Sequence, residues 1–214
     1  MNIEKFNLSL FNSINASDNA LDFTISFAIF IANDLFYIVI LLMFLAWFKV
    51  SFDTKKQIVK ATVFTIVAFL ISQVISSFFY YPRPFVLDVG RTIIEHSPNG
   101  SFPSDHMLFF STIAFSYIFS KQKAVGYVFL AFAFLVAWSR VYLGVHYPMD
   151  MEGALIIAVL LNFVGLSLWR KYGSYLVSMI LKVYEFLFSA MIKKAISAKL
   201  SLLDICDFKL LLLL

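Results

Sequence analysis

The sequence predicts an all-α protein, a polytopic membrane helix bundle of about five transmembrane helices with an N-terminal interfacial helix and a C-terminal amphipathic helix. Of the 214 residues, 61% are hydrophobic, only 14% are charged and 26 are phenylalanine, a bias that a soluble domain does not need. Several apolar runs are long enough to cross a hydrocarbon core of about 30 Å. Basic residues are also concentrated in a few segments, as expected when a bilayer separates the loops.

The first 48 residues combine an interfacial helix with the first span. Residues 1–22 are mixed, with apolar side chains at roughly helical spacing, and lack the basic start and cleavage site of a signal peptide. The apolar run 21–48 is longer than one crossing requires, and Asn33 and Asp34 fall in its middle. Either the span starts near them, after a helix lying flat in the interface, or they face the bundle interior. An interfacial Asp34 is the preferred interpretation.

The remaining apolar runs predict four more spans, at about 58–80, 106–120, 124–138 and 150–168. Two domains follow: a membrane-embedded domain over 1–170 and a cytoplasmic tail over 171–214. In the tail, apolar residues recur near the helical period between Gly173 and Leu200, with lysines on other faces. This pattern predicts an amphipathic helix on the inner leaflet. A sixth span is the alternative, disfavoured by Lys182 and Glu185 in its middle.

Charge counting sets the topology. The loops 49–60 and 121–123, with everything after Leu168, hold 13 of the 17 lysines and arginines, so this set is expected to be cytoplasmic. The amino terminus and the loops 81–103 and 139–149 then lie outside. Three arginines in these outer loops are exceptions to the bias, and each calls for an anionic partner or for snorkelling to lipid head groups. The three are Arg83, Arg91 and Arg140. Snorkelling is the preferred interpretation only for Arg91.

The segment after Ser139 contains an arginine, a histidine and an aspartate at spacings that suit a catalytic or binding site. Pro148 favours a helix start, which puts His146 just before the helix and Asp150 one turn inside it, within contact of each other. A carboxylate bonded to one imidazole nitrogen leaves the other as a lone-pair nucleophile or base. Arg140 supplies a planar donor fork that suits phosphate oxygens.

The long outer loop carries two further groups. Arg83 lies between two prolines, which hold its backbone extended and present its guanidinium. Ser104 immediately precedes an apolar helix as a natural N-cap, so free backbone N–H groups and the helix dipole would favour an anion there. His106, in the first turn, is placed to donate a proton. An ordinary N-cap is the alternative for Ser104.

The composition also limits cofactors and partners. The outer loops lack the clustered carboxylates that a magnesium site needs, so no metal and no other cofactor are expected. Cys206 is the single cysteine, which excludes an internal disulfide and a cysteine-rich metal site. The net charge of +4 is modest. The expected partners are the lipid bilayer and a lipid substrate, with no nucleic acid, and no oligomeric state is predicted.

Three ordered segments resemble the signature motifs of the type 2 phosphatidic acid phosphatase superfamily, and more closely those of bacterial undecaprenyl-diphosphatases associated with bacitracin resistance. The resemblance covers about 21–168, and its segments are Pro82-Arg83-Pro84-Phe85-Val86, Ser101-Phe102-Pro103-Ser104-Asp105-His106 and Ser139-Arg140-Val141-Tyr142-Leu143-Gly144-Val145-His146, with Asp150 following. It implies a nucleophilic His146 that forms a phosphohistidine, an orienting Asp150 and a general acid His106. The residues implied to hold phosphate oxygens are Arg83, Ser104 and Arg140.

The sequence departs from the superfamily pattern at two positions. Ser76 stands where the first motif usually has a lysine, which removes one phosphate contact. Asp105 stands where the second motif usually has a glycine. A carboxylate pointing inward would repel phosphate, so the Asp105 side chain is expected to turn away or to pair with an arginine.

The resemblance implies hydrolysis of a polyprenyl diphosphate, undecaprenyl diphosphate, to undecaprenyl phosphate. The reaction would need no metal and would recycle the cell-wall lipid carrier on the outer leaflet of the bacterial inner (plasma) membrane, with the site facing the periplasm or cell exterior. One alternative is a phosphatase of phosphatidate, phosphatidylglycerol phosphate or a lipid A phosphate. Another is a protein that binds or transports an anionic lipid without catalysis, which the full set of candidate catalytic residues disfavours.

Overall fold

The computed structural model describes the backbone of residues 3–211 and the side chains of residues 3–189. Throughout this part of the chain the regular elements are helices, which confirms the predicted all-α class. The chain forms two compact units, up to Leu168 and from Trp169 onward. The elements are α1 (Ile3–Ile14), α2 (Asp22–Ile29), a π-helical turn (Phe30–Asp34), α3 (Leu35–Trp47), α4 (Phe52–Phe78), a 3-10 turn (Pro84–Leu87), α5 (Asp105–Ile118), α6 (Lys123–Tyr142) and α7 (Pro148–Leu211).

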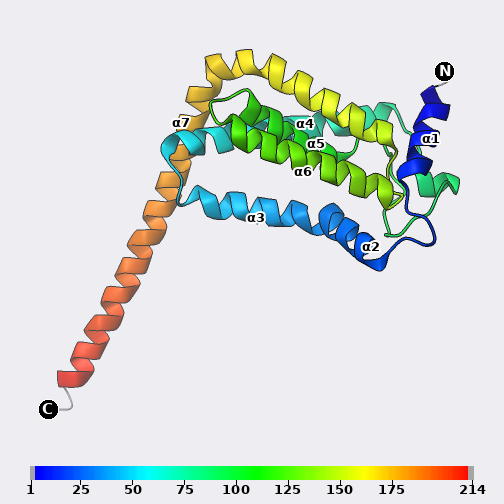
Figure 1. Cartoon of the computed structure of the whole chain (residues 1–214). Helices are drawn as coiled ribbons and strands as arrows, with labels where there is room; N and C mark the ends of the chain where they lie inside the picture. Colours follow the sequence, from blue (N-terminus) through cyan, green and yellow to red (C-terminus); the bar gives the residue numbers. More distant parts are fainter. Residues whose placement is uncertain (1–2, 212–214) are drawn as a thin grey trace. The chain divides into compact units, whose positions relative to one another are not determined.

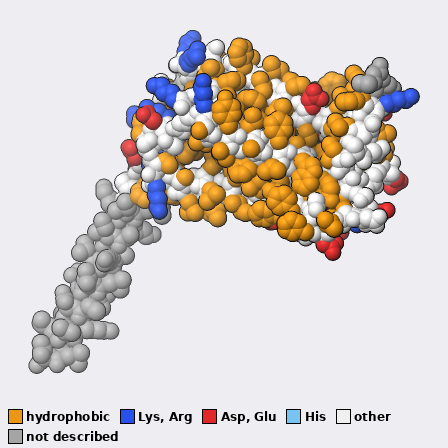
Figure 2. Space-filling view, in the orientation of Figure 1, with side chains coloured by type: hydrophobic (Ala, Val, Ile, Leu, Met, Phe, Trp, Pro, Cys, Tyr) orange, Lys and Arg blue, Asp and Glu red, His pale blue; other side chains and the backbone are white. Residues whose placement is uncertain are grey.

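Four helical stretches are long and apolar enough to cross a membrane: Asp22–Trp47, Phe52–Phe78, Lys123–Tyr142 and Pro148–Ser189. α5 corresponds to the remaining predicted span, but it has only 14 residues. It packs against α4 and α6, and ten of its 14 residues are buried. Figure 1 shows α3, α4, α5 and α6 running side by side. Figure 2 shows a band of hydrophobic side chains across this body, with most charged side chains at its ends, as in a multi-pass membrane protein.

The first span is one continuous helical stretch interrupted only by the π-helical turn Phe30–Asp34. Ile31 and Leu35 are buried at this turn, whereas Asn33 and Asp34 are exposed. The hypothesis that these two polar side chains face the bundle interior is therefore wrong. The helix itself does not begin at them, because a π turn adds a residue to a helix without ending it, so the start of the span near Asp34 stays a prediction.

α7 continues without a break through Leu168, at the border between the two compact units. The division into domains 1–170 and 171–214 stays a prediction. Gly173 is the only residue there with a low helix propensity, and a single glycine costs about 1 kcal/mol in a helix interior, too little to end it. The predicted amphipathic segment thus continues α7 rather than starting a new helix. Met191, Ile192 and Cys206 lie outside the residues whose side chains are described.

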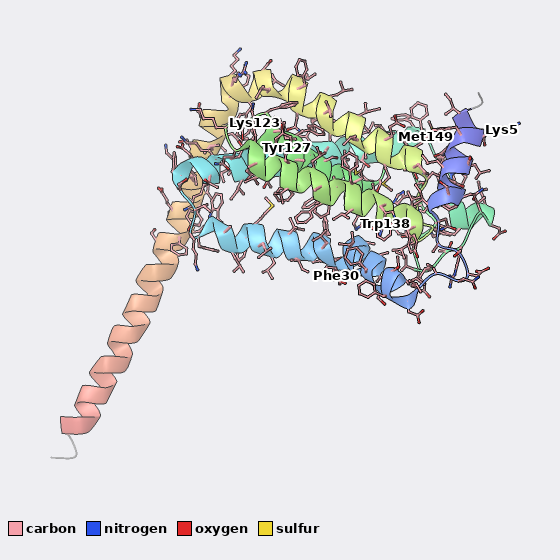
Figure 3. All side chains as sticks on the ribbon, viewed as in Figure 1. Lys5, Phe30, Lys123, Tyr127, Trp138 and Met149 are labelled. Carbon is pink, nitrogen blue, oxygen red and sulfur yellow. The ribbon has the colours of Figure 1, made fainter. Side chains whose placement is uncertain are left out.

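The segments that connect the helices lie at two opposite ends of the bundle. Figure 3 places Met149, at the start of α7, at the same end as Lys5 of α1, and Lys123 of α6 at the other end. The backbone N–H of Met149 donates to Asn7 Oδ1 of α1 at 3.1 Å. Phe11 of α1 is fully buried and its ring lies 5.4 Å from that of Tyr147. α1 is thereby fastened to the segment that carries the predicted nucleophile.

Candidate active site

The turn between α6 and α7 is built to hold His146 in one place. Gly144 has φ +79°, and a Cβ there would lie 2.2 Å from the carbonyl oxygen of Arg91, so only glycine fits. The Val145 N–H then donates to the Arg140 carbonyl at 3.1 Å. Pro148 opens α7, as its fixed φ favours. His146 is consequently presented just before a helix N-terminus.

The predicted contact between His146 and Asp150 is made. His146 Nδ1 lies 3.2 Å from Asp150 Oδ2, and the two residues are 2% and 1% exposed. The same oxygen accepts the Tyr147 N–H at 2.7 Å and a hydrogen bond from Ser101 Oγ. Because a carboxylate only accepts, Nδ1 carries the proton and Nε2 keeps its lone pair. This is the arrangement that a nucleophilic imidazole needs.

The surroundings of His146 keep it uncharged. Burial, followed by the positive charges of Arg83 and Arg140, lowers the pKa of His146 well below its usual range. The side chain is therefore neutral at pH 7, when its Nε2 lone pair is available for attack.

Arg83 is directed at the nucleophilic nitrogen. Its Nη1 lies 2.9 Å from His146 Nε2 and donates to the Val145 carbonyl at 2.9 Å, while Nε donates to Asn99 Oδ1 at 3.0 Å. The residue is only 5% exposed. Its backbone is extended between the two prolines, as predicted. The guanidinium therefore lies directly beside His146 Nε2, where a group attacked by this nitrogen would have to bind.

Two buried polar groups beside this pair have unused hydrogen-bonding capacity. Arg140 is 2% exposed, yet within the described part of the chain nothing accepts a hydrogen bond from its Nε or Nη2. Ser104 Oγ is also buried without a partner there. A buried charge without a partner is strongly destabilising, so such groups normally mark a ligand site. Their chemistry, a guanidinium and a hydroxyl, suits an oxyanion.

The start of α5 lies next to the His146–Asp150 pair. Ser104 occupies the N-cap position with extended backbone, but its hydroxyl does not make the capping hydrogen bond, so it is not an ordinary cap. Its N–H instead donates to the Asp150 carbonyl at 3.3 Å, which joins the first turns of α5 and α7. His106 is half-buried, packs its ring 5.4 Å from that of Phe36, and interacts electrostatically with His146.

Both departures from the superfamily pattern have a structural role. The Asp105 carboxylate accepts a hydrogen bond from Ser72 Oγ of α4 at 2.7 Å, as expected of a side chain that turns away from a bound anion. Ser76 Oγ donates to the Phe102 carbonyl at 3.0 Å. The residue in the place of the usual lysine thus holds the segment that leads into α5.

The structure adds three residues that sequence analysis did not select: His96, Asn99 and Ser101. Asn99 and Ser101 anchor Arg83 and Asp150, and the His96 ring centroid lies 6.2 Å from that of His146. The signal that could have identified them was their position in the long connection 81–103, next to one of the motifs. Arg91 lies apart from these groups, donating to the Ser17 carbonyl at 2.5 Å.

A buried His–Asp pair with two arginines, at one end of a helical membrane bundle, defines a membrane-embedded site for an anionic group. The chain belongs to the PAP2 superfamily, whose family model matches residues 57–184. It is an enzyme of this phosphatase family, and the family and its relatives support dephosphorylation of a lipid phosphate.

Two relatives and one solved structure resemble most of the chain. It is 33% identical over 192 residues (90% of this chain, 97% of the relative) to YbjG of Escherichia coli (strain K12), whose name as an undecaprenyl-diphosphatase is itself provisional. It is 27% identical over 191 residues (88% and 96%) to the undecaprenyl-diphosphatase BcrC of Bacillus subtilis (strain 168). The crystal structure of Aquifex aeolicus LpxE shares the fold, with a TM-score of 0.60 and 24% identity over 78% of this chain and 99% of that one.

Proposed function

We propose that the chain hydrolyses undecaprenyl diphosphate to undecaprenyl phosphate and inorganic phosphate on the outer leaflet, through a phosphohistidine on His146. The names of the relatives support the substrate. The observation that carries the chemistry is the buried guanidinium of Arg140, whose Nε and Nη2 have no acceptor within the described chain and whose charge acts on His146 of the His146–Asp150 pair. A terminal phosphate would supply the missing acceptors.

In the first step His146 Nε2 attacks the terminal phosphorus. The bond from phosphorus to the bridging oxygen breaks, and its electron pair leaves with undecaprenyl phosphate. Arg83 Nη1, now 2.9 Å from Nε2, exchanges that contact for a phosphate oxygen, while Arg140 and Ser104 hold the others. Asp150 stabilises the imidazolium that forms. Catalysis is then mostly positioning and electrostatic stabilisation of the phosphoryl oxygens.

In the second step water attacks the phosphohistidine. His106 accepts a proton from the water as the phosphorus–nitrogen bond breaks, and the electron pair returns to His146 Nε2. The leaving group of the first step is a phosphate, which departs without protonation. His106 is accordingly more important for a monoester, whose alkoxide leaving group requires a proton.

Phosphate release by the purified protein tests the substrate. With EDTA present, undecaprenyl diphosphate is expected to be hydrolysed and phosphatidate to be hydrolysed more slowly, because the arginines supply the positive charge that a metal would otherwise provide. Faster hydrolysis of phosphatidate would move the chain to another lipid phosphate. Inactivation by EDTA, reversed by added magnesium, would contradict the metal-independent mechanism.

Labelling with substrate that carries ³²P in its terminal phosphate tests the intermediate. The wild-type protein should acquire an acid-labile, alkali-stable label, and His146→Ala should acquire none and lose turnover while remaining folded. Label that persists in His146→Ala would transfer the nucleophile to another residue, with His106 the first to examine. Arg91→Lys serves as a control that keeps the label, because its side chain lies apart from the site.

Thiol accessibility tests the side of the membrane. In a Cys206→Ser background, Ser97→Cys lies in the loop beside the site and Lys121→Cys lies at the opposite end, and both positions are exposed. A membrane-impermeant thiol reagent should label the first variant in intact spheroplasts and the second only after lysis. The reverse pattern would place the site on the cytoplasmic side and end the proposal of lipid-carrier recycling on the outer leaflet.

A further inference from the structure

His96 lies against the nucleophile without taking part in the mechanism described above. Its ring centroid is 6.2 Å from that of His146, with 73° between the ring planes. His96 Nδ1 lies 3.1 Å from the Ser97 carbonyl oxygen, which only accepts, so Nδ1 carries the proton. Nε2 of neutral His96 is then a lone-pair acceptor, and it becomes a donor only when the ring is protonated.

The pKa of His96 is affected by charged and titratable groups from several segments. Burial, and then the positive charges of Arg83 and Arg140, lower the pKa of His96, whereas the hydrogen bond to Ser97 and the charge of Asp105 raise it. His106 also interacts with it electrostatically. His96 is therefore neutral at pH 7. The dominant local charge is that of the two arginines.

We propose that His96 is a further ligand of the terminal phosphate, which takes up a proton from solvent when the phosphate binds and donates it from Nε2 to a phosphate oxygen. This inference rests on the proposed function, because it assumes that phosphate occupies the space between His146 and the arginines. The proton returns to solvent when inorganic phosphate leaves. No covalent bond changes at His96.

The electrostatics favour this behaviour. A phosphate dianion brings two negative charges to the site and offsets the field of Arg83 and Arg140, so the protonated form of a neighbouring imidazole becomes favourable. A permanent cation beside the arginines would instead add repulsion whenever the site is empty. A histidine supplies the third cation only when the anion is present.

The motif position that usually holds a lysine supplies no positive charge in this protein. Ser76, in the position of the usual motif lysine, has its hydroxyl bonded to the Phe102 carbonyl and carries no charge. The only described hydrogen bond of the His96 side chain goes to the adjacent Ser97, so the ring does not join distant segments. Its placement beside His146 therefore serves the site more than the fold.

Calorimetric titration with inorganic phosphate, in two buffers of different ionisation enthalpy, measures the proposed proton directly. At pH 7 the wild-type protein should take up more protons on binding than His96→Gln, by up to about one proton. Glutamine places an N–H donor near the position of Nε2 but does not titrate, so His96→Gln should keep most of the affinity. His96→Ala should lose the proton uptake and bind phosphate about 10–100-fold more weakly.

Glu95→Gln is the matched control, because Glu95 is the adjacent residue and is exposed. It should bind phosphate and take up protons as the wild type does. Equal proton uptake and affinity in wild type, His96→Gln and His96→Ala would overturn the role of His96 while leaving the proposed function intact. A wild-type protein that neither binds phosphate nor hydrolyses a polyprenyl diphosphate would instead contradict the proposed function itself. A lower melting temperature in His96→Ala, with unchanged proton uptake, would indicate a structural role only.

Discussion

Arg140 and Lys60 are both buried cations, at opposite ends of the bundle, and their hydrogen bonds differ. Lys60 is 3% exposed and its Nζ donates to the Ser116 carbonyl at 3.2 Å, which Gln57 also contacts at 2.8 Å. Arg140 is 2% exposed and its Nε and Nη2 have no acceptor within the described chain. Burial is common to both, so it is the unused donor capacity of Arg140 that indicates a ligand.

Helix polarity explains why the two sites differ. Ser116 belongs to the last turn of α5, where carbonyl groups lack partners and the helix dipole favours a cation. Arg140 faces the other end, where α5 and α7 both begin and their dipoles favour an anion. Lys60 thus donates to a carbonyl group of the protein, whereas the unused donors of Arg140 fit the phosphate that the proposed function places there.

The largest expected effect comes from removing the unpaired guanidinium. Arg140→Gln should lower kcat/KM for undecaprenyl diphosphate by about 10²–10⁴-fold, since two charged hydrogen bonds of about 1.5–3 kcal/mol each are lost. Thermal stability without substrate should not fall, because an uncompensated buried charge is removed. Steady-state kinetics and a melting curve in detergent measure both quantities.

Arg91→Gln is the control for this prediction, because Arg91 already bonds the Ser17 carbonyl and lies near Asp18. Its activity should stay within about twofold of wild type. If Arg140→Gln lost stability and kept its activity, Arg140 would be structural like Lys60, and the comparison would fail.

A smaller effect on the diphosphate is expected for His106→Ala. A general acid contributes about 10²–10⁴-fold where the leaving group needs a proton. The variant should therefore lose more activity on phosphatidate, to the extent that the wild type hydrolyses it, than on undecaprenyl diphosphate. Parallel rate measurements on the two substrates provide the check. Equal losses would mean that His106 binds phosphate or acts mainly on water in the second step.

Local spacing made part of the site predictable from sequence. His146 and Asp150 are four residues apart across a helix start, a distance at which helix geometry alone brings side chains together. The extended backbone of Arg83 followed from its neighbouring prolines. These predictions needed no knowledge of how distant segments pack.

The remaining features depend on long-range packing. His96 and Ser101 reach the site from a connection without regular helical spacing, and their partners lie 45 residues or more away in sequence. The continuity of α7 beyond Leu168 was missed because basic residues suggested a membrane boundary, although Gly173 is too weak a helix breaker to end the helix there. The exposed Asp34 agrees with the preferred interpretation from sequence, but the π turn beside it was not predicted.

The pH profile tests whether the buried cations set the charge of the nucleophile. Neutral His146 is the reactive form, and its pKa is lowered by burial and by Arg83 and Arg140. The acid limb of kcat/KM should therefore lie below pH 6.5, the ordinary range of a histidine. Arg83→Gln removes one positive charge, so the pKa of His146 should be higher in this variant. The acid limb of its kcat/KM profile should therefore move toward pH 6.5. An unchanged acid limb would mean that another group titrates in this profile.

The smallest expected effect lies at the other buried cation. Lys60→Met keeps the length of the side chain but removes the hydrogen bond to the Ser116 carbonyl, so the free energy of unfolding should fall by about 1–3 kcal/mol. Turnover of undecaprenyl diphosphate should be unchanged below the melting temperature, because this end of α5 is remote from the helix start at Ser104. Thermal denaturation in detergent and kinetics at a temperature well below the transition measure the two effects separately. Lys56→Met is the control, since Lys56 is exposed, lies over the exposed Phe52 ring and pairs with exposed Asp53 at 3.3 Å, a type of ion pair that contributes about 0–1 kcal/mol. A Lys60→Met variant with reduced turnover and an unchanged melting temperature would show that the two buried cations do not divide into structural and functional roles as their hydrogen bonds indicate.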